Sequence, residues 1–313
     1  MITAYFLEHG LWTVIPHQLQ ENFADMRDMG FDGVAITFGE SDAVYARRAF
    51  ELQVKLAHEA GLKVHVIPSR VGGRFAGAPL TPSIWVSQHP EHAISNEGWW
   101  MPMGCLDASA FVEWICGFVG QILSDYPVDG IIWDEPKGTK GPSNHPATRA
   151  RYGPHPTEAD NHASWRDFFE TLTNHCASVR PGIPQAVMNE GAIPESLTSQ
   201  FARLPAITHH GYDGNLARQS FFHEEPAWHK YRLESVWERT SRECEAAGKE
   251  SYALVENMLM PAEAMEEYER NFDAYLTNYR PDHLSVYYYA HNNEDPEGVM
   301  SITRRLMKKH LVR

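Results

Sequence analysis

The sequence predicts an α/β protein that folds as a single (β/α)8 TIM barrel. Short apolar runs alternate with longer amphipathic segments eight times along the 313 residues. Alternation of strands and helices favours a parallel sheet, and eight such units favour closure into a barrel. No low-complexity linker divides the sequence, so residues 1–313 are expected to form one domain. An open doubly wound sheet is the alternative fold, but no Gly-rich GxGxxG turn follows the first apolar run to support it.

The first half of the chain supplies four of the expected units. Hydrophobic periodicity predicts strands over 3–7, 33–38 and 63–68, a fourth strand that ends at Pro136, and helices over 18–29, 42–60 and 111–124. Gly30 and Gly61 are suited to end the first two helices, and Asp42 to cap the second. A long Gly-, Pro- and Trp-rich loop, 69–105, follows the third strand, and loops of this length are usually functional.

The second half repeats the pattern after another long loop, 137–160. Strands are expected over 184–190, 206–211, 252–258 and 283–290. Helices are expected over 165–179, 194–203, 226–247 and 297–311, with one more that begins at Pro261. The long loops after strands three and four should partly close one end of the barrel.

Composition narrows the partners and the location. Hydrophobic residues make up 43% of the chain, and the formal charge of -14 should repel nucleic acids and anionic membranes. The four cysteines form no CxxC pair or zinc-type spacing, which suits reduced thiols, and we expect no metal and no cofactor. No signal peptide or membrane-spanning run is evident, so a cytoplasmic location is expected. The oligomeric state is left open, and a homo-oligomer is compatible with the sequence.

The stretch Asp129-Gly130-Ile131-Ile132-Trp133-Asp134-Glu135-Pro136 is the most informative in the chain. An apolar run that ends on two carboxylates and a proline is typical of a buried parallel strand with chemistry at its end. Asp134 and Glu135 should therefore lie at the carboxyl end of strand four, where barrel enzymes place their active sites. Alternation along the strand favours Asp134 pointing inward and Trp133 packing in the core, and the turn at Pro136 could rotate Glu135 inward.

Other polar side chains follow the remaining strands and should meet Asp134 and Glu135 at the same rim. The catalytic candidates are the carboxylates Asp134, Glu135, Glu190 and Glu256. The candidates for binding substrate are Glu40, Arg70, Trp100, His210, Tyr212, Asp213, Asn257, Tyr288 and His291. At most one of the adjacent His209 and His210 can face inward, and Tyr288 is expected inward with Tyr287 and Tyr289 against the helices. Trp85, Trp99 and Trp100 could stack on sugar rings or pack the long loop onto the barrel.

Crowded carboxyl groups push one another's pKa values apart, and glycoside cleavage needs one carboxylic acid and one carboxylate. The pattern DG-x-x-x-D-E, Asp129 to Glu135, resembles strand four of the spherulin-4-like and endo-α-1,4-polygalactosaminidase families of TIM-barrel glycoside hydrolases. This resemblance implies that Asp134 and Glu135 are catalytic acids and that Glu190 is a third. The same strand is similar to the Asn-Glu-Pro motif of the large retaining clan, with Asp134 replacing Asn. That similarity implies Glu135 as acid/base and Glu256 as nucleophile.

Two assignments therefore stay open: Glu135 with Glu256 as just described, or Asp134 as nucleophile or stabiliser with Glu190 as acid. Either predicts a catalytic barrel that hydrolyses the O-glycosidic bond of a small glycoside or oligosaccharide, with that carbohydrate as its partner. The first alternative is a divalent-metal-dependent sugar isomerase or epimerase, in which Glu135, Glu190, Glu256 and His209 or His210 hold the ion. The second is a sugar-binding barrel that has no catalytic activity.

Overall fold

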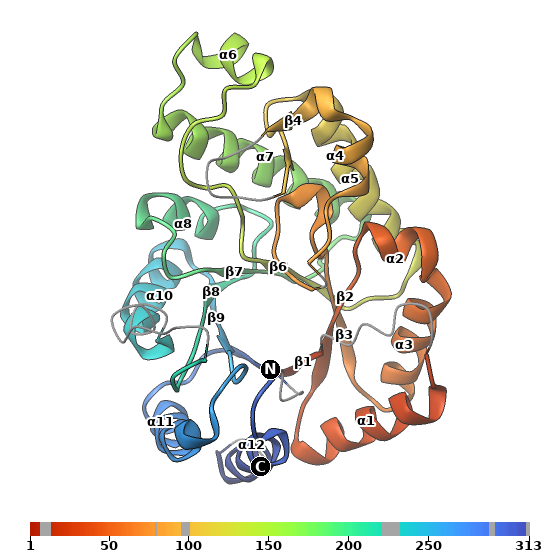
Figure 1. The fold of residues 1–313 in the computed structure, drawn as a ribbon, viewed down its shortest axis with the longest axis vertical. Coiled ribbons are helices and arrows are strands. Elements are labelled where there is room, and N and C mark those ends of the chain that lie inside the picture. Colours follow the sequence, from red (N-terminus) through yellow and green to blue (C-terminus); the bar gives the residue numbers. More distant parts are fainter. Residues whose placement is uncertain (7–13, 79, 95–100, 221–231, 288–291, 311–313) are drawn as a thin grey trace.

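The chain folds into a closed barrel of eight parallel strands surrounded by helices, which confirms the predicted (β/α)8 architecture (Figure 1). The structure is a computed structural model that describes residues 1–6, 14–78, 80–94, 101–220, 232–287 and 292–310. Around the barrel the strand order is β1-β10-β9-β8-β7-β6-β3-β2, and every neighbouring pair with a defined register is parallel.

The barrel strands are β1 (Ile2–Phe6), β2 (Gly33–Thr37), β3 (Lys63–Ile67), β6 (Gly130–Asp134), β7 (Gln185–Asn189), β8 (His209–Gly214), β9 (Glu250–Val255) and β10 (His283–Tyr287). The main helices are α1 (Pro16–Met29), α2 (Glu40–Tyr45), α3 (Arg47–Glu59), α5 (Ser109–Asp125), α7 (Glu158–Val179), α8 (Glu195–Ala202), α10 (Leu233–Ala247), α11 (Met265–Asn278) and α12 (Pro296–His310). As expected, Gly30 ends α1: its φ of 95° is left-handed, and its N–H donates to the carbonyl of Arg27.

Side chains on the two faces of the strands form two separate apolar clusters. The inner cluster fills the barrel and consists of Ala35, Ile67, Ile132, Ala186, Met188, Tyr252, Leu254 and Tyr287. The outer cluster lies between strands and helices, and there the fully buried Trp133 packs on Phe75 and Phe169 as a core residue. The expectation that Tyr287 faces the helices is wrong, because it belongs to the inner cluster. Tyr288 and Tyr289 lie outside the described residues.

Several element boundaries differ from the sequence-based prediction. The expected helix 42–60 is two helices, because at Ala46 the backbone leaves helical geometry with φ -133° and ψ 21°. Strand β8 begins and ends three residues later than predicted, since the polar His209 and His210 continue the ladder with β9. Helix α10 begins at Leu233 rather than at residue 226, and residues 221–231 lie outside the described part.

The two long loops contain secondary structure of their own. The segment after β3 forms η1 (Val71–Gly73), α4 (Ile84–Gln88), η2 (Pro90–His92) and a small antiparallel pair, β4 (Ala93–Ile94) with β5 (Met103–Gly104). The segment after β6 contains α6 (Pro146–Tyr152). Figure 1 shows α4, β4 and α6 gathered beside α5 and α7 on one side of the barrel. The expectation of irregular loops was therefore wrong in detail, because short local helices satisfy much of this backbone.

Candidate active site

Strand β6 delivers two adjacent carboxylates to the same rim of the barrel. Asp134 is the last residue of β6, follows the inward-facing Ile132 by two positions, and is only 5% exposed. Glu135 has a φ of 38°, which is left-handed backbone that a non-glycine residue adopts at a cost of about 1–3 kcal/mol. This conformation breaks the strand alternation, and the Glu135 N–H still donates to the carbonyl of Met188 at 2.9 Å. Both carboxyl groups can therefore act in one site.

Lys137, which was not among the residues expected at the site, links two of the predicted acids, Glu135 and Glu190. The Lys137 Nζ lies 2.6 Å from Oε2 of Glu135 and 3.4 Å from Oε2 of Glu190, and its side chain is 14% exposed. A largely enclosed ammonium between two carboxylates holds their orientation through charge-assisted hydrogen bonds. Lys137 directly follows Pro136, so its position next to Asp134 and Glu135 in the sequence could have identified it as a site residue.

Strands β8 and β9 add two more acids to the same cluster. Asp213 lies near the end of β8, is 6% exposed, and its carboxyl group interacts electrostatically with that of Glu135. Glu256 follows β9, and its N–H donates to the carbonyl of Gly214 at 2.9 Å. The charges of Glu135 and Asp134 act on both side chains, so the strand ends of β6, β8 and β9 bring their acids together.

The cluster separates its carboxyl groups into ionised and protonated members. Burial alone would raise the pKa of Glu135, but the Lys137 ammonium, the neighbouring Asp213 carboxyl group and the charge of Arg70 outweigh burial and lower that pKa. Burial, followed by the negative charges of Glu135 and Asp134, raises the pKa of Glu256 to about 8. Burial and the charges of Glu135 and Glu256 also raise the pKa of Asp213 well above its ordinary value. At neutral pH the cluster thus contains the Glu135 carboxylate together with a largely protonated Glu256.

The loop after β3 supports this arrangement from one side. Arg70 has a φ of 55°, and its Nε donates to the carbonyl of Gly77 at 2.6 Å while its charge acts on Glu135. Arg74 is 1% exposed; its carbonyl accepts the Lys137 N–H at 2.9 Å and its Nη1 donates to the Lys137 carbonyl at 3.4 Å. The backbone of Lys137 is therefore held on both sides by one buried arginine.

Two residues expected at the site on β8 instead face the helices. The His210 Nε2 lies 2.7 Å from Oε2 of Glu243 on α10, and the Tyr212 hydroxyl donates to the same oxygen at 2.7 Å. Because Asp213 faces inward, alternation along the strand turns His210 and Tyr212 outward. His209 faces inward, but it lies at the opposite end of the barrel beside His283, with ring centroids 5.4 Å apart. His210 therefore contacts helix α10 and His209 lies at the opposite end of the barrel, away from the acids that follow β6, β8 and β9.

Two further expected contacts with substrate are also corrected. The Glu40 carboxylate accepts the N–H groups of Gly72 at 2.9 Å and Trp85 at 2.7 Å, so it organises the loop after β3. The Asn257 side chain donates to the carbonyl of Tyr287 at 3.1 Å and to Oγ1 of Thr303 on α12 at 3.4 Å, so it faces the helix layer. These contacts engage the Glu40 carboxylate and the amide N–H groups of Asn257.

The structure describes some of the aromatic candidates, and others lie outside the described residues. Trp85 stacks on Trp114 of α5, with ring centroids 4.8 Å apart and planes at 15°. Of its two expected roles, this contact matches the packing of the long loop onto the barrel. Trp99, Trp100, Tyr288 and His291 lie outside the described residues. Among the predicted substrate-binding residues that the structure describes, Arg70 and Asp213 both interact electrostatically with Glu135.

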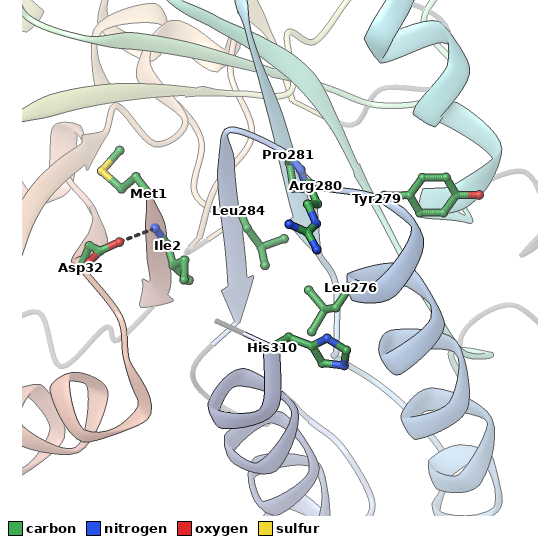
Figure 2. Close-up of a pocket in the computed structure, with 9 residues that line it drawn as sticks. All are labelled: Met1, Ile2, Asp32, Leu276, Tyr279, Arg280, Pro281, Leu284 and His310. Atoms are coloured by element: carbon green, nitrogen blue, oxygen red, sulfur yellow. Dashed lines mark hydrogen bonds between the residues drawn. The ribbon is translucent and has the colours of Figure 1, made fainter. Parts of the chain in front are cut away.

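A separate cavity of about 440 Å³ opens at the other end of the barrel (Figure 2). Its lining includes Ile2 at the start of β1, Leu284 near the start of β10, and His310 at the end of α12. Figure 2 shows Asp32 on its edge, hydrogen-bonded to the N–H of Ile2 at 3.0 Å. Because the strands are parallel, this end is opposite the rim that holds Asp134 and Glu256, so the cavity is not part of the carboxylate site.

The described residues contain neither a cluster that could hold a metal ion nor a helix that could span a membrane. No group of three or more His, Cys, Asp or Glu side chains in this part of the chain is arranged so that it could hold a metal ion. Among its helices, none combines the length and apolar character needed to cross a bilayer.

No protein-family model matches the chain, and no curated protein does. Solved structures of glycoside hydrolases nevertheless share its fold. An α-L-fucosidase from Paenibacillus thiaminolyticus is 13% identical, with a TM-score of 0.64 over 98% of this chain and 48% of its own. A β-galactosidase from Halorubrum lacusprofundi is 10% identical, with a TM-score of 0.71 over 99% of this chain and 58% of its own.

An α-amylase from Geobacillus thermoleovorans is 9% identical, with a TM-score of 0.59 over 98% of this chain and 78% of its own. The chain spans about half the length of the fucosidase and 58% of the β-galactosidase. At these identities the comparisons show the fold alone. The chain is a TIM barrel, and these glycoside hydrolases contain a barrel of similar fold.

Proposed function

We propose that this protein is a glycoside hydrolase that cleaves the O-glycosidic bond of a small glycoside or oligosaccharide. The observation that carries the proposal is a pair of carboxyl groups in opposite protonation states at the carboxyl-terminal rim of the barrel. The lowered pKa of Glu135 keeps it ionised, and the pKa of about 8 keeps Glu256 protonated at pH 7. Glycoside cleavage uses one group of each kind.

The roles follow from the protonation states. Glu256 gives its proton to the oxygen of the leaving group as the bond between that oxygen and the anomeric carbon breaks. The Glu135 carboxylate attacks the anomeric carbon or activates a water that does so, with Asp134 beside it. This reverses the assignment in which Glu135 is the acid and Glu256 the nucleophile, because Lys137 stabilises the ionised form of Glu135. Glu190 shares the Lys137 ammonium and helps to orient it.

The structural neighbours support the reaction class but not a particular sugar. An α-L-fucosidase, a β-galactosidase and an α-amylase have similar barrels, and the same fold supports many chemistries. The segments inserted after β3 and β6 favour short substrates over the interior of long polymers. Full activity on the interior of a long polymer would contradict this expectation.

The test is a screen of aryl glycosides and oligosaccharides with wild type and with Glu135→Gln, Glu256→Gln, Asp134→Asn and Glu190→Gln. Glu59→Gln is the matched control, because Glu59 is an exposed partner of Lys55 on α3. Glu135→Gln should lose turnover on every substrate. Glu256→Gln should lose far more on poor leaving groups than on nitrophenolate, which needs little protonation. Wild-type turnover by all four site variants on a glycoside that the native protein cleaves would refute the proposal.

A further inference from the structure

The segment 137–139, which begins with the lysine of the active site, is held by side chains of helix α7. The segment belongs to neither a helix nor a strand, so its carbonyls need partners from elsewhere. The Gly138 carbonyl accepts from Nε1 of Trp165 at 3.2 Å and from Nδ2 of Asn161 at 3.3 Å. The same Nδ2 donates to the Thr139 carbonyl at 3.0 Å. Both donors are buried, with Trp165 0% and Asn161 4% exposed.

Arg74 holds the same segment from the side of the loop after β3. Its Nη1 donates to the Lys137 carbonyl, and its guanidinium lies over the Trp165 ring, 5.5 Å from the centroid. Gly138 has a φ of 74°, and a Cβ there would lie 2.7 Å from Arg74 Nη1 and 2.9 Å from Cε of Met103. Three consecutive carbonyls therefore accept from one connected group of buried side chains, and the segment is closely packed against it.

The position of this backbone decides where the Lys137 ammonium lies. A lysine side chain has many rotamers, so a fixed backbone limits the places that its ammonium can reach. Nζ of Lys137 lies 2.6 Å from Oε2 of Glu135 and 3.4 Å from Oε2 of Glu190. A displacement of the segment would change both distances, and with them the orientation of both carboxylates.

We propose that Asn161 and Trp165 of α7 are positioning residues that, together with Arg74, fix the segment 137–139 and so hold the Lys137 ammonium between Glu135 and Glu190. The inference rests on the proposed function for the catalytic role of Glu135, whereas the placement of the ammonium can be tested without substrate. The residues that support a reacting group from behind keep it in the narrow range of geometries that catalysis requires. The alternative is that the three donors only satisfy buried carbonyls and stabilise the fold.

The first test follows the ionisation of Glu135 by NMR of its carboxyl carbon in protein labelled at glutamate. The signal is identified by its absence from Glu135→Gln. Against the effect of burial, the Lys137 ammonium lowers the pKa of Glu135. A looser contact favours the ionised form less, so Asn161→Ala should raise this pKa and Glu135 should titrate at higher pH than in wild type. Arg70, Asp213 and Glu256, the other charged neighbours of Glu135, remain in place.

Two further variants accompany Asn161→Ala. Trp165→Phe removes the indole N–H but keeps an aromatic ring, and it should move the titration of Glu135 in the same direction. Asn271→Ala is the matched control, because the Asn271 amide on α11 donates to the Leu216 carbonyl at 2.7 Å in another part of the barrel. It should leave the titration unchanged. If folded Asn161→Ala and Trp165→Phe titrate as wild type does, or if Asn271→Ala moves the titration equally, the proposal is overturned.

The second test measures turnover of a glycoside found in the screen. Asn161→Ala should lower kcat about tenfold while KM stays within about twofold, because the reacting groups are misplaced and substrate binding is not. In a Lys137→Met background the same substitution should change kcat by less than about twofold, since its effect passes through the ammonium that is no longer there. Equal losses in the two backgrounds would overturn the proposal, because Asn161 would then act on the fold as a whole.

The two tests separate the possible failures. If no glycoside is cleaved, the proposed function fails, while the titration of Glu135 still decides whether α7 places the Lys137 ammonium. If a glycoside is cleaved but the titration and the kcat losses follow the outcomes that overturn the inference, the proposed function stands and the positioning role of Asn161 and Trp165 is wrong.

Discussion

Lys137 is the cation on which the ionised state of Glu135 depends, and Lys137→Met removes it while keeping most of the side-chain volume. The pair is largely enclosed, with side chains 14% and 18% exposed, so solvent screens it weakly. Breaking a buried pair by removing one partner costs about 3–5 kcal/mol. We expect the lower end, about 3 kcal/mol, because Glu135 can take up a proton when its partner is lost.

Thermal unfolding followed by circular dichroism at pH 7 measures this loss. An unfolding entropy of about 2.1 cal/mol/K per residue over 313 residues converts about 3 kcal/mol into a drop of about 4–5 °C in melting temperature. The matched control is Lys55→Met, which removes an exposed pair with Glu59 whose side chains are 62% and 53% exposed. Such surface pairs contribute about 0.5 kcal/mol or less, so the control should shift by under 1 °C.

The pH dependence of the difference gives a second check. A carboxyl group whose pKa is lowered in the folded state stabilises the fold above its unfolded pKa, and this stabilisation is lost as pH falls through the folded value. The gap between wild type and Lys137→Met should therefore be largest near pH 7 and shrink below about pH 4. Equal shifts for Lys137→Met and Lys55→Met at pH 7, or a gap that is constant from pH 7 to pH 3, would refute the reasoning.

Three further predictions concern other parts of the structure. Wild-type kcat/KM should fall as pH rises through about 8, the pKa of Glu256, and the residual activity of Glu256→Gln should lack that alkaline fall. Burial lowers the pKa of His65 to about 4 in the folded protein, whereas the unfolded chain binds this proton from about pH 6.5 downward. About 3 kcal/mol of folding free energy should therefore be lost between pH 6.5 and pH 4. Denaturant titrations of His65→Asn should lack most of that loss. Arg74→Lys should lower the free energy of unfolding by about 2 kcal/mol and reduce turnover. The reason is that a lysine cannot donate to the carbonyls of Gly104 and Lys137 at the same time, as Arg74 does. A denaturant midpoint equal to that of wild type would contradict this prediction.

For strand β8, the sequence did not indicate which side chains face into the barrel and which face the helices. On most strands of this barrel the outward face is apolar, so the period of the sequence indicates which side chains face inward. In β8, His209 through Gly214, polar side chains occupy both faces, because Glu243 on α10 satisfies His210 and Tyr212 on the outside. The pattern therefore could not assign the faces, and His210 and Tyr212 were expected beside Asp213.

The sequence by itself determined the barrel and the rim at which the acids gather. Eight alternating units specify the topology, and a carboxylate that directly follows an apolar strand must lie at its carboxyl end, as Asp134 and Glu256 do. Only the tertiary structure decided the protonation states. Those depend on burial and on charges from segments far apart in the chain: Lys137 lies between Glu135 and Glu190, which are 55 positions apart, and Asp213 approaches from a third strand. No local pattern encodes such distances, because they are set by the closure of the barrel.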